Sequence, residues 1–389
     1  MTSNKHSNPS GINTKLAHCG NNPADYFGFV NPPVVHASTV LFPDAKTLKS
    51  ENQRYTYGTH GTPTTDALCE AINMLEGAEK TVLVPSGLAA ITVPLLGVLA
   101  QGDHALIADS VYGPTRRFAN NMLRKMGVEV EYYDPTIGRA IETLMKPNTK
   151  VVFTESPGSN TFEIQDIPAI SSVAHAHGAV VLMDNTWATP VNFKPLDHGV
   201  DISITAGTKY PAGHSDILIG FISANERTKK IVEDAHMFLG MSVSGDDAYN
   251  TLRSMRTMGI RLAHQSKTAL DLAQWLETMP QVAEVLHPAL PSHKGHEIWK
   301  RDFKGASSLF SIVLKGGGEK EAHAFLNALK IFKLGYSWGG YESLAVEVHL
   351  EDRVFKHQYL GSLLRLQIGI EDFDDLKADL EQALIATKL

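Results

Sequence analysis

Cysteine is scarce in this sequence, which limits the ways in which the fold can be stabilised. Cys19 and Cys69 are the only two among 389 residues, so nothing beyond a single disulfide bond can form. This excludes small disulfide-rich folds and favours a reducing compartment. Basic residues are not in excess either, because 35 Lys and Arg stand against 42 Asp and Glu and give a net charge of −7. Such a charge disfavours nucleic acids and anionic membranes as partners, and we expect neither.

Apolar runs of the kind used for export or membrane insertion are also lacking. Residues 1–20 contain no stretch of the signal-peptide type, so we expect a cytoplasmic protein. Residues 81–102 are nearly uncharged over the length that a bilayer span needs. Pro85, Gly87 and Pro94 interrupt this run, and such residues break helices. We predict instead a buried strand ending at Val84, a tight turn and then a buried helix.

Common nucleotide and metal motifs are missing. The glycine pattern of dinucleotide-binding folds and the lysine loop that binds nucleotide phosphates do not occur. Histidine is frequent, with 17 residues, but its spacing does not match a metal site. His175 and His177 lie near a predicted helix end, and His293 and His296 flank a glycine turn. Neither pair has a matching set of carboxylates or cysteines, so we expect no metal.

What the sequence does contain is an alternation of short apolar stretches and helical segments. Predicted strands end near Val84, Ala108, Thr154 and Met183, and a further β-branched stretch runs through residues 201–209. Strands that alternate with helices in this way predict an α/β fold with a mostly parallel sheet, covered by helices on both faces.

Four polar side chains come just after four of these predicted strands. They are Ser86, Tyr112, Asp184 and Lys209. In parallel sheets ligands bind beyond the carboxyl ends of the strands, so we expect these side chains to converge on one rim. A lone lysine after an apolar strand is ordinarily a surface residue. The alternative is a partly desolvated amine that acts as a nucleophile, and the convergence favours it.

The pattern changes after about residue 245. Residues 246–280 predict one long or kinked helix, and strand-like stretches follow at 307–317 and 363–372. Helices are expected near 319–330 and 372–386. We therefore predict three regions, with an antiparallel sheet in the last: an N-terminal arm over 1–55, a large domain over 56–250 and a smaller α+β domain over 251–389.

The rim residues suit pyridoxal phosphate (PLP). This cofactor needs an amine for its aldehyde, an acid for its ring nitrogen, a stacked face and a cup for its phosphate. Lys209 can supply the amine, Asp184 the acid and Tyr112 the stacked ring. A turn at a predicted helix start can hold the phosphate with backbone N–H groups, and it consists of Ser86, Gly87 and Leu88. Each feature alone also fits a cap or a plain turn, but together they favour PLP.

Motifs along most of the chain carry a family resemblance. They include VPSGLAAI at 84–91, SVYGPT at 110–115, MDNTWA at 183–188, GTKYPAGHSD at 207–216 and YSWGGYESL at 336–344. With these motifs the sequence resembles the PLP enzymes of cysteine and methionine metabolism. This resemblance implies fold type I, with a mostly parallel seven-stranded sheet flanked by helices and a smaller α+β domain. Within the family Trp338 points to the bacterial cystathionine β-lyases, since the γ-enzymes usually carry leucine there.

The resemblance also implies roles for single residues. Lys209 would bind the cofactor and move protons, Asp184 would pair with the ring nitrogen, and Tyr112 would stack on the ring. The phosphate would be held by Thr208 together with Ser86, Gly87 and Leu88. Arg365 would bind the substrate α-carboxylate in a site framed by Ser337 and Trp338. Tyr57 would reach in from a neighbouring subunit of a homotetramer assembled from two dimers.

The implied reaction is α,β-elimination on a small sulfur amino acid. With L-cystathionine the products would be homocysteine, pyruvate and ammonia, a step in methionine biosynthesis. A broader cysteine-S-conjugate β-lyase and a γ-lyase or γ-synthase of the same family remain open. A protein that keeps the fold without catalysis is also open, although the intact set of Lys209, Asp184, Tyr112 and Arg365 argues against it.

One stretch departs from the family pattern. The related β-lyases usually carry two arginines where YGTHGTPTT, residues 57–65, has Thr59 and His60. The first of these arginines would bind the cofactor phosphate across the subunit interface, and the second would lie near the distal part of the substrate. The change predicts a weaker phosphate clamp and altered recognition of the leaving thiol, unless Arg54 or another cation fills the gap.

Overall fold

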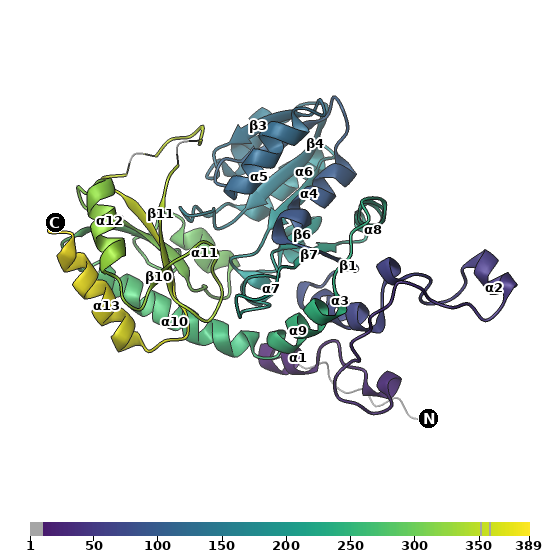
Figure 1. Cartoon of the computed structure of the whole chain (residues 1–389). Helices are drawn as coiled ribbons and strands as arrows, with labels where there is room; N and C mark the ends of the chain where they lie inside the picture. Colours follow the sequence, from purple (N-terminus) through teal and green to yellow (C-terminus); the bar gives the residue numbers. More distant parts are fainter. Residues whose placement is uncertain (1–10, 351, 358) are drawn as a thin grey trace.

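The computed structural model describes residues 11–350, 352–357 and 359–389. Figure 1 shows two sheets side by side, with the N-terminal segment extending away from both. The strands of the first sheet are β1 (Lys80–Val84), β2 (His104–Ala108), β3 (Glu129–Tyr133), β4 (Thr149–Glu155), β5 (Val180–Asp184), β6 (Ile202–Thr205) and β7 (Gly220–Ala224). The strands of the second are β8 (Val282–Leu286), β9 (Leu309–Leu314), β10 (Lys333–Leu334), β11 (Leu344–Val348) and β12 (Leu363–Gln367).

The first sheet is the one that the alternating pattern predicts. Its seven strands run in the order β1-β7-β6-β5-β4-β2-β3. Only β7 is antiparallel to its neighbours, β1 and β6, and the other pairs are parallel. The prediction of a mostly parallel seven-stranded sheet is therefore confirmed. Because β1 and β6 both run opposite to β7, the carboxyl ends of β1, β4, β5 and β6 share one edge of the sheet.

Helices cover both faces of this sheet, as the side chains of β1 show. Val82 and Val84 pack in the same apolar cluster as α4 (Gly87–Val98), whereas Leu83 packs in the cluster that contains α3 (Pro63–Glu76). Neighbouring residues of a strand point to opposite faces. This two-sided burial explains the three consecutive apolar residues, 82–84, that end β1. The other helices of this part are α5 (Gly113–Phe118), α6 (Ile167–Ala176), α7 (Thr189–Asn192) and α8 (Lys229–Phe238).

The charge-poor segment at 81–102 is divided between β1 and α4. Ser86 caps α4, and its Oγ accepts the N–H of Ala89 at 3.1 Å. The helix has 12 residues and ends before Leu99. Among the described residues, no helix has both the length and the apolar character required to cross a membrane.

The second sheet and its helices form the C-terminal part. Its order is β10-β11-β12-β9-β8, and all pairs except β10 with β11 are antiparallel. The single long helix predicted over 246–280 is instead two helices, α9 (Gly245–Met255) and α10 (Met258–Leu276), separated at Arg256 and Thr257. The remaining helices are α11 (His296–Asp302), α12 (Glu319–Ala328) and α13 (Phe373–Ala386).

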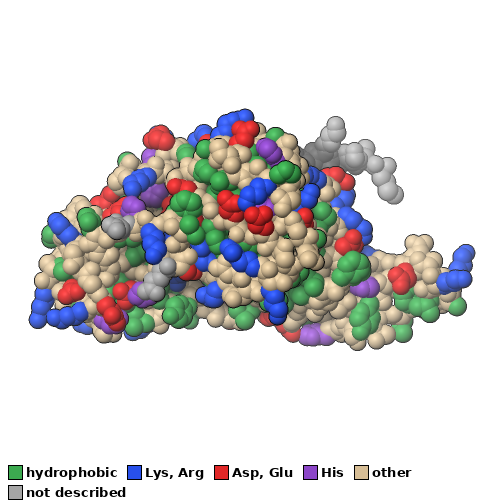
Figure 2. Space-filling view, turned by 90° about the horizontal axis from the view of Figure 1, so that it is seen from above, with side chains coloured by type: hydrophobic (Ala, Val, Ile, Leu, Met, Phe, Trp, Pro, Cys, Tyr) green, Lys and Arg blue, Asp and Glu red, His purple; other side chains and the backbone are tan. Residues whose placement is uncertain are grey.

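The N-terminal segment divides into a docked helix and a projecting arm. Leu16 of α1 (Ile12–His18) is fully buried, and Arg256 donates to its carbonyl at 3.0 Å. The arm, residues 20–57, carries α2 (Ala45–Ser50) and extends from the body (Figure 1). Figure 2 shows hydrophobic side chains on this projection. Its exposed apolar residues include Phe27, Phe29, Val30, Leu41 and Leu48.

Candidate active site

The carboxyl ends of β4 and β5 place two acids next to each other. Glu155 is the last residue of β4 and Asp184 is the last residue of β5, and the two are paired in register. The prediction placed each acid one residue beyond its strand, so the strands extend one residue further than expected. In parallel strands paired residues point to the same face, so both carboxyl groups lie on one face at the carboxyl edge of the sheet, near its middle.

Lys209 lies further from its strand than the sequence suggests. The β6 strand ends at Thr205, and Lys209 follows in a tight turn in which its N–H donates to the carbonyl of Ala206 at 3.0 Å. The prediction placed Lys209 directly after its strand, whereas three residues, 206–208, separate it from the end of β6. Gly207 lies in this turn, where a Cβ would come within 2.4 Å of the ring of Phe221, so the close approach requires glycine.

The amine of Lys209 is held by residues of the C-terminal part. Its Nζ donates to the hydroxyl of Ser337 at 2.5 Å and lies 5.2 Å from the ring centre of Trp338. Burial is the main cause that lowers the pKa of Lys209 to about 8, and the nearby positive charge of Arg365 contributes. Lysine amines of this kind are nucleophilic near neutral pH, because a useful fraction carries no proton.

Arg365 of β12 lies beside this amine without a carboxylate partner among the described residues. Its guanidinium donates to Oδ1 of Asn160 and to the carbonyl of Ser337, each at 3.2 Å. Burial lowers the pKa of Arg365 to about 10, which leaves it charged at neutral pH. Two neutral acceptors orient the group while its charge stays uncompensated. Such a guanidinium can bind a carboxylate in a bidentate pair.

Asp184 is almost completely buried and is fixed by the residue two positions on. Its Oδ1 accepts the N–H of Thr186 at 3.0 Å and the Thr186 hydroxyl at 2.5 Å. Burial raises the pKa of Asp184, while the Thr186 hydrogen bonds and then the charge of Lys209 act in the opposite direction. A buried carboxylate that is oriented in this way is suited to a cationic ring nitrogen.

Tyr112 is the residue just before α5, at the same edge of the sheet. Its backbone N–H donates to Oε2 of Glu155 at 2.7 Å. Burial raises the pKa of the Tyr112 phenol, and the charge of Asp184 adds to the effect. The side chain is 45% exposed, so an aromatic face remains free for another ring.

The start of α4 forms a close cradle against the turn before Lys209. A Cβ at Gly87 would lie 2.5 Å from the Cβ of Ala206, so only glycine fits. The neighbouring Leu88 begins the same helix. Thr208 lies in the turn, but its hydroxyl donates to the carbonyl of Ile219 at 3.2 Å and accepts that residue's N–H at 3.0 Å. A helix start with free N–H groups can hold a phosphate. The Thr208 hydroxyl would have to give up a hydrogen bond to Ile219 before it could donate to that phosphate.

Tyr57 is not part of this group within one chain. It lies on the arm, where it pairs with Thr39 in an isolated bridge and its ring centre is 6.1 Å from that of His60. No hydrogen bond or ring contact in the described part of the chain connects it to Lys209.

Two residues of the site were not assigned a role from the sequence. Asn160 contacts Arg365, and Glu155 contacts Tyr112. Both belong to the segment that leaves β4, at the same rim as the predicted residues. The position of Glu155 next to a strand end was visible in the sequence, whereas Asn160 lies five residues further along a loop whose course the pattern does not predict.

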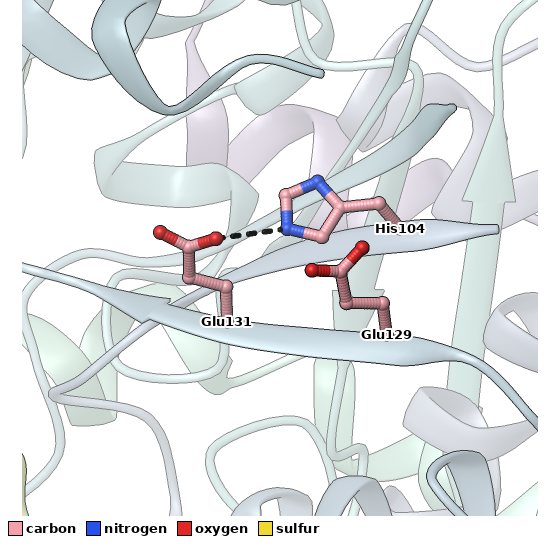
Figure 3. A group of neighbouring side chains, drawn as sticks. All are labelled: His104, Glu129 and Glu131. Atoms are coloured by element: carbon pink, nitrogen blue, oxygen red, sulfur yellow. Dashed lines mark ion pairs between the residues drawn. The ribbon is translucent and has the colours of Figure 1, made fainter. Parts of the chain in front are cut away.

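A second polar cluster lies at the far edge of the sheet. Figure 3 shows His104, Glu129 and Glu131, whose ligand atoms are close enough to hold a metal ion. His104 is fully buried, and its Nε2 is 3.3 Å from Glu131. The amine of Lys146 donates to Glu129 at 2.8 Å and to Glu131 at 2.5 Å. This ammonium pairs with both carboxylates and offsets part of their charge, which supports a structural role for the cluster.

The groups around Lys209 fit PLP. The amine of Lys209 can lose its proton and suits the aldehyde, and the buried carboxylate of Asp184 suits the ring nitrogen. The free face of Tyr112 suits the ring, and the glycine cradle at the start of α4 suits the phosphate. The remaining guanidinium, that of Arg365, is free for an amino-acid carboxylate.

Comparison with known proteins agrees with this geometry. A putative cystathionine beta-lyase of Rhizobium johnstonii is 64% identical over 97% of this chain and 96% of its own length. The cystathionine beta-lyase MetC of Escherichia coli is 42% identical over 95% of this chain and 97% of its own length. An L-alanine/L-glutamate racemase of Wolbachia pipientis is 41% identical over 95% of this chain and 96% of its own length.

A solved structure has the same fold. The crystal structure of metB from Corynebacterium glutamicum superposes with a TM-score of 0.90 at 31% identity, over 97% of this chain and 98% of that one. The fold-type prediction is therefore confirmed. The model of the Cys/Met metabolism PLP-dependent enzymes matches residues 13–385, and the chain therefore belongs to this family of PLP-dependent enzymes of cysteine and methionine metabolism.

Proposed function

We propose that this protein is a carbon–sulfur β-lyase that cleaves L-cystathionine to homocysteine, pyruvate and ammonia. The observation that carries the proposal is the grouping of Lys209, Asp184 and Arg365 at one rim, in a chain 64% identical to a putative cystathionine beta-lyase. The overall reaction converts one cystathionine and one water into homocysteine, pyruvate and ammonia. The Cβ–S bond is broken, and the sulfur is released as a thiol.

Each residue has a distinct task in this proposal. Arg365 holds the substrate α-carboxylate, with Ser337 and Trp338 lining that position. The neutral amine of Lys209 removes the Cα proton and later returns a proton. When bound, PLP supplies an electron sink for the pair of electrons left at Cα. Asp184 keeps a negative charge at the ring nitrogen, and Tyr112 covers the ring.

The cofactor phosphate would be held by the start of α4. The backbone N–H groups of Gly87 and Leu88, next to the cap residue Ser86, would donate to the phosphate. The positive end of the helix dipole lies at this helix start and favours a bound anion. Thr208 would contribute its hydroxyl. We expect Tyr57 of a neighbouring subunit to contact the cofactor as well, because within one chain it lies on the projecting arm.

A substrate panel tests the proposed reaction. The purified holoenzyme is assayed with cystathionine, cystine and S-methylcysteine, and pyruvate and α-ketobutyrate are measured separately. Pyruvate from cystathionine at the highest kcat/KM is the expected outcome. α-Ketobutyrate as the main product would assign a γ-enzyme instead, and equal kcat/KM values for all three would assign a broad cysteine-S-conjugate lyase.

A racemase is a second candidate, because a relative with that name is 41% identical over 95% of this chain. The same Lys209 amine could return a proton to Cα when no β leaving group is present, with the Tyr112 phenol available as a donor. Incubation with L-alanine or L-glutamate, followed by chiral chromatography, distinguishes the two. A kcat/KM for racemisation above that for cystathionine cleavage would reverse the proposal.

We further propose a homotetramer with active sites shared between subunits, three regions at 1–55, 56–250 and 251–389, and a cytoplasmic location. The support for association is the arm, where Phe27 is 98% exposed and Leu41 is 86% exposed. Large apolar side chains in such numbers usually mark an interface. Sedimentation velocity tests the assembly, and deletion of residues 1–55 should dissociate it.

A further inference from the structure

The edge of the sheet that carries Asp184 also carries a second acid on the neighbouring strand. Glu155 and Asp184 end adjacent parallel strands in register and therefore point to the same face. The backbone of Glu155 is also held in place, because Nε2 of Gln165 donates to the backbone carbonyl of Glu155 at 2.8 Å. Two carboxyl groups this close cannot both ionise cheaply in a poorly solvated site.

The surroundings decide which of the two carries the charge. Asp184 receives two hydrogen bonds from Thr186 and lies near the charge of Lys209. Glu155 receives a single backbone N–H, and burial together with the Asp184 carboxylate raises its pKa well above the usual range.

The other charged groups near Glu155 oppose each other. Arg353 and Glu163 both face it, but they pair at 2.9 Å and largely cancel. Asp184 thus keeps the negative charge, and Glu155 is the neutral member of the pair.

The contact that Glu155 makes bears on the aromatic ring of the site. Tyr112 is the first residue before α5, and its own side chain makes no capping hydrogen bond. Its N–H is held by Oε2 of Glu155 at 2.7 Å. Among the described residues, no other acceptor is recorded for this N–H, so the orientation of the Tyr112 backbone depends on Glu155.

We propose that Glu155 is a positioning residue, whose neutral carboxyl group fixes the backbone of Tyr112 and so the aromatic face that covers the cofactor. The inference rests on the proposed function only in the role given to Tyr112. A neutral acceptor is sufficient for this task. The amide of Glu155→Gln therefore replaces it, and Glu155→Ala does not.

Hydrogen–deuterium exchange of the holoenzyme measures the contact directly. In Glu155→Ala the exchange rate of the peptide covering residues 109–113 is expected to rise about tenfold, the size of a lost hydrogen bond to a carboxyl group. In Glu155→Gln it stays within about twofold of wild type. Glu129→Gln, on the exposed edge strand β3, is the matched control and leaves this peptide unchanged.

We expect kcat to rank the two variants in the same way as the exchange rate does. Glu155→Gln retains kcat and its pH profile, and Glu155→Ala loses kcat about tenfold or more. Unchanged exchange in Glu155→Ala would overturn the positioning role, and a Glu155→Gln variant as impaired as Glu155→Ala would overturn the neutral state. The exchange result does not depend on the substrate, so a wild type that fails to cleave cystathionine removes the proposed function and leaves this inference standing.

Discussion

The amine of Lys209 and the hydroxyl of Ser337, 128 residues apart in the chain, are joined by a hydrogen bond of 2.5 Å. Ser337 has a φ of +78°, a left-handed conformation that is uncommon outside glycine. The same residue's carbonyl accepts from Arg365 at 3.2 Å. One serine therefore sets the position of the amine relative to the guanidinium, and so the base relative to a bound α-carboxylate.

Lys209→Ala should abolish turnover and the absorbance of the cofactor attached to the enzyme. In the described part of the chain, no other lysine amine donates to Ser337 or is recorded over the Trp338 ring. Lys209→Arg should fail as well, because a guanidinium does not form a Schiff base. Near-normal turnover of Lys209→Ala without added amine would contradict the assignment.

The capture of PLP by the apoenzyme should depend on pH with a midpoint near the pKa of about 8 for Lys209. This pKa lies below that of a free lysine, so the folded state favours the neutral amine, and capture accelerates as pH rises through this value. The associated stability has the same sign, because between pH about 8 and the ordinary lysine pKa the unfolded chain holds a proton at this lysine and the folded chain does not. Stability therefore falls as pH drops through this window and does not change further below it. Stopped-flow absorbance between pH 6.5 and 9.5 measures the capture, and a midpoint close to that of free lysine would refute the prediction.

The sequence predicts the position of a rim residue where a residue type and a strand end coincide. The positions of Asp184 and Ser86 follow from that rule, since buried strands are short and apolar. The turn that separates Lys209 from β6 does not follow from it, because Gly207 packs there against Phe221 in a contact that only the folded chain makes.

Contacts between distant segments are beyond a pattern-based prediction. The acceptors of Arg365 come from a loop 205 residues away and from a turn 28 residues away. Periodicity describes which face of an element is buried, and it carries no information on which loops meet.

Asp184→Asn should impair chemistry more than folding. The amide has the same shape and still accepts from Thr186, but it provides no negative charge for the ring nitrogen. A loss on the order of 10²-fold in kcat, ~3 kcal/mol, is expected for a central electrostatic group. The free energy of unfolding of the apoenzyme should change by less than ~1 kcal/mol, because burial already disfavours the carboxylate. An unchanged kcat would mean that Asp184 is only a structural residue.

Asn160→Asp should weaken substrate binding. Asn160 has a φ of +66°, which aspartate also tolerates, so the backbone is preserved. The new carboxylate would pair with Arg365 and compete with the substrate carboxylate. KM should rise about tenfold or more with a smaller change in kcat. Asn160→Gly, which removes the acceptor without adding a charge, is the control. Equal KM values in both variants would show that competition is not the cause.

Thr59→Arg should tighten retention of the cofactor. Thr59 lies in the short helix Gly58–His60 that follows the arm, and the His60 ring bonds to Thr56 at 2.8 Å. Arg54 does not fill the gap within this chain, since it pairs with Asp66 at 3.1 Å. An arginine at position 59 of the neighbouring subunit would add a charge-assisted contact to the phosphate, worth ~1 kcal/mol or more.

The measurement is the rate at which PLP is lost during dialysis against a scavenging amine. Thr59→Arg is expected to lose the cofactor several-fold more slowly than wild type, whereas Thr59→Gln, which has length without charge, should resemble wild type. We also expect wild type to discriminate less sharply for cystathionine over S-methylcysteine than relatives with both arginines, because His60 stands where those relatives place a fixed charge near the distal part of the substrate. If wild type retains PLP as firmly as Thr59→Arg, another cation already supplies the charge and the clamp argument is wrong.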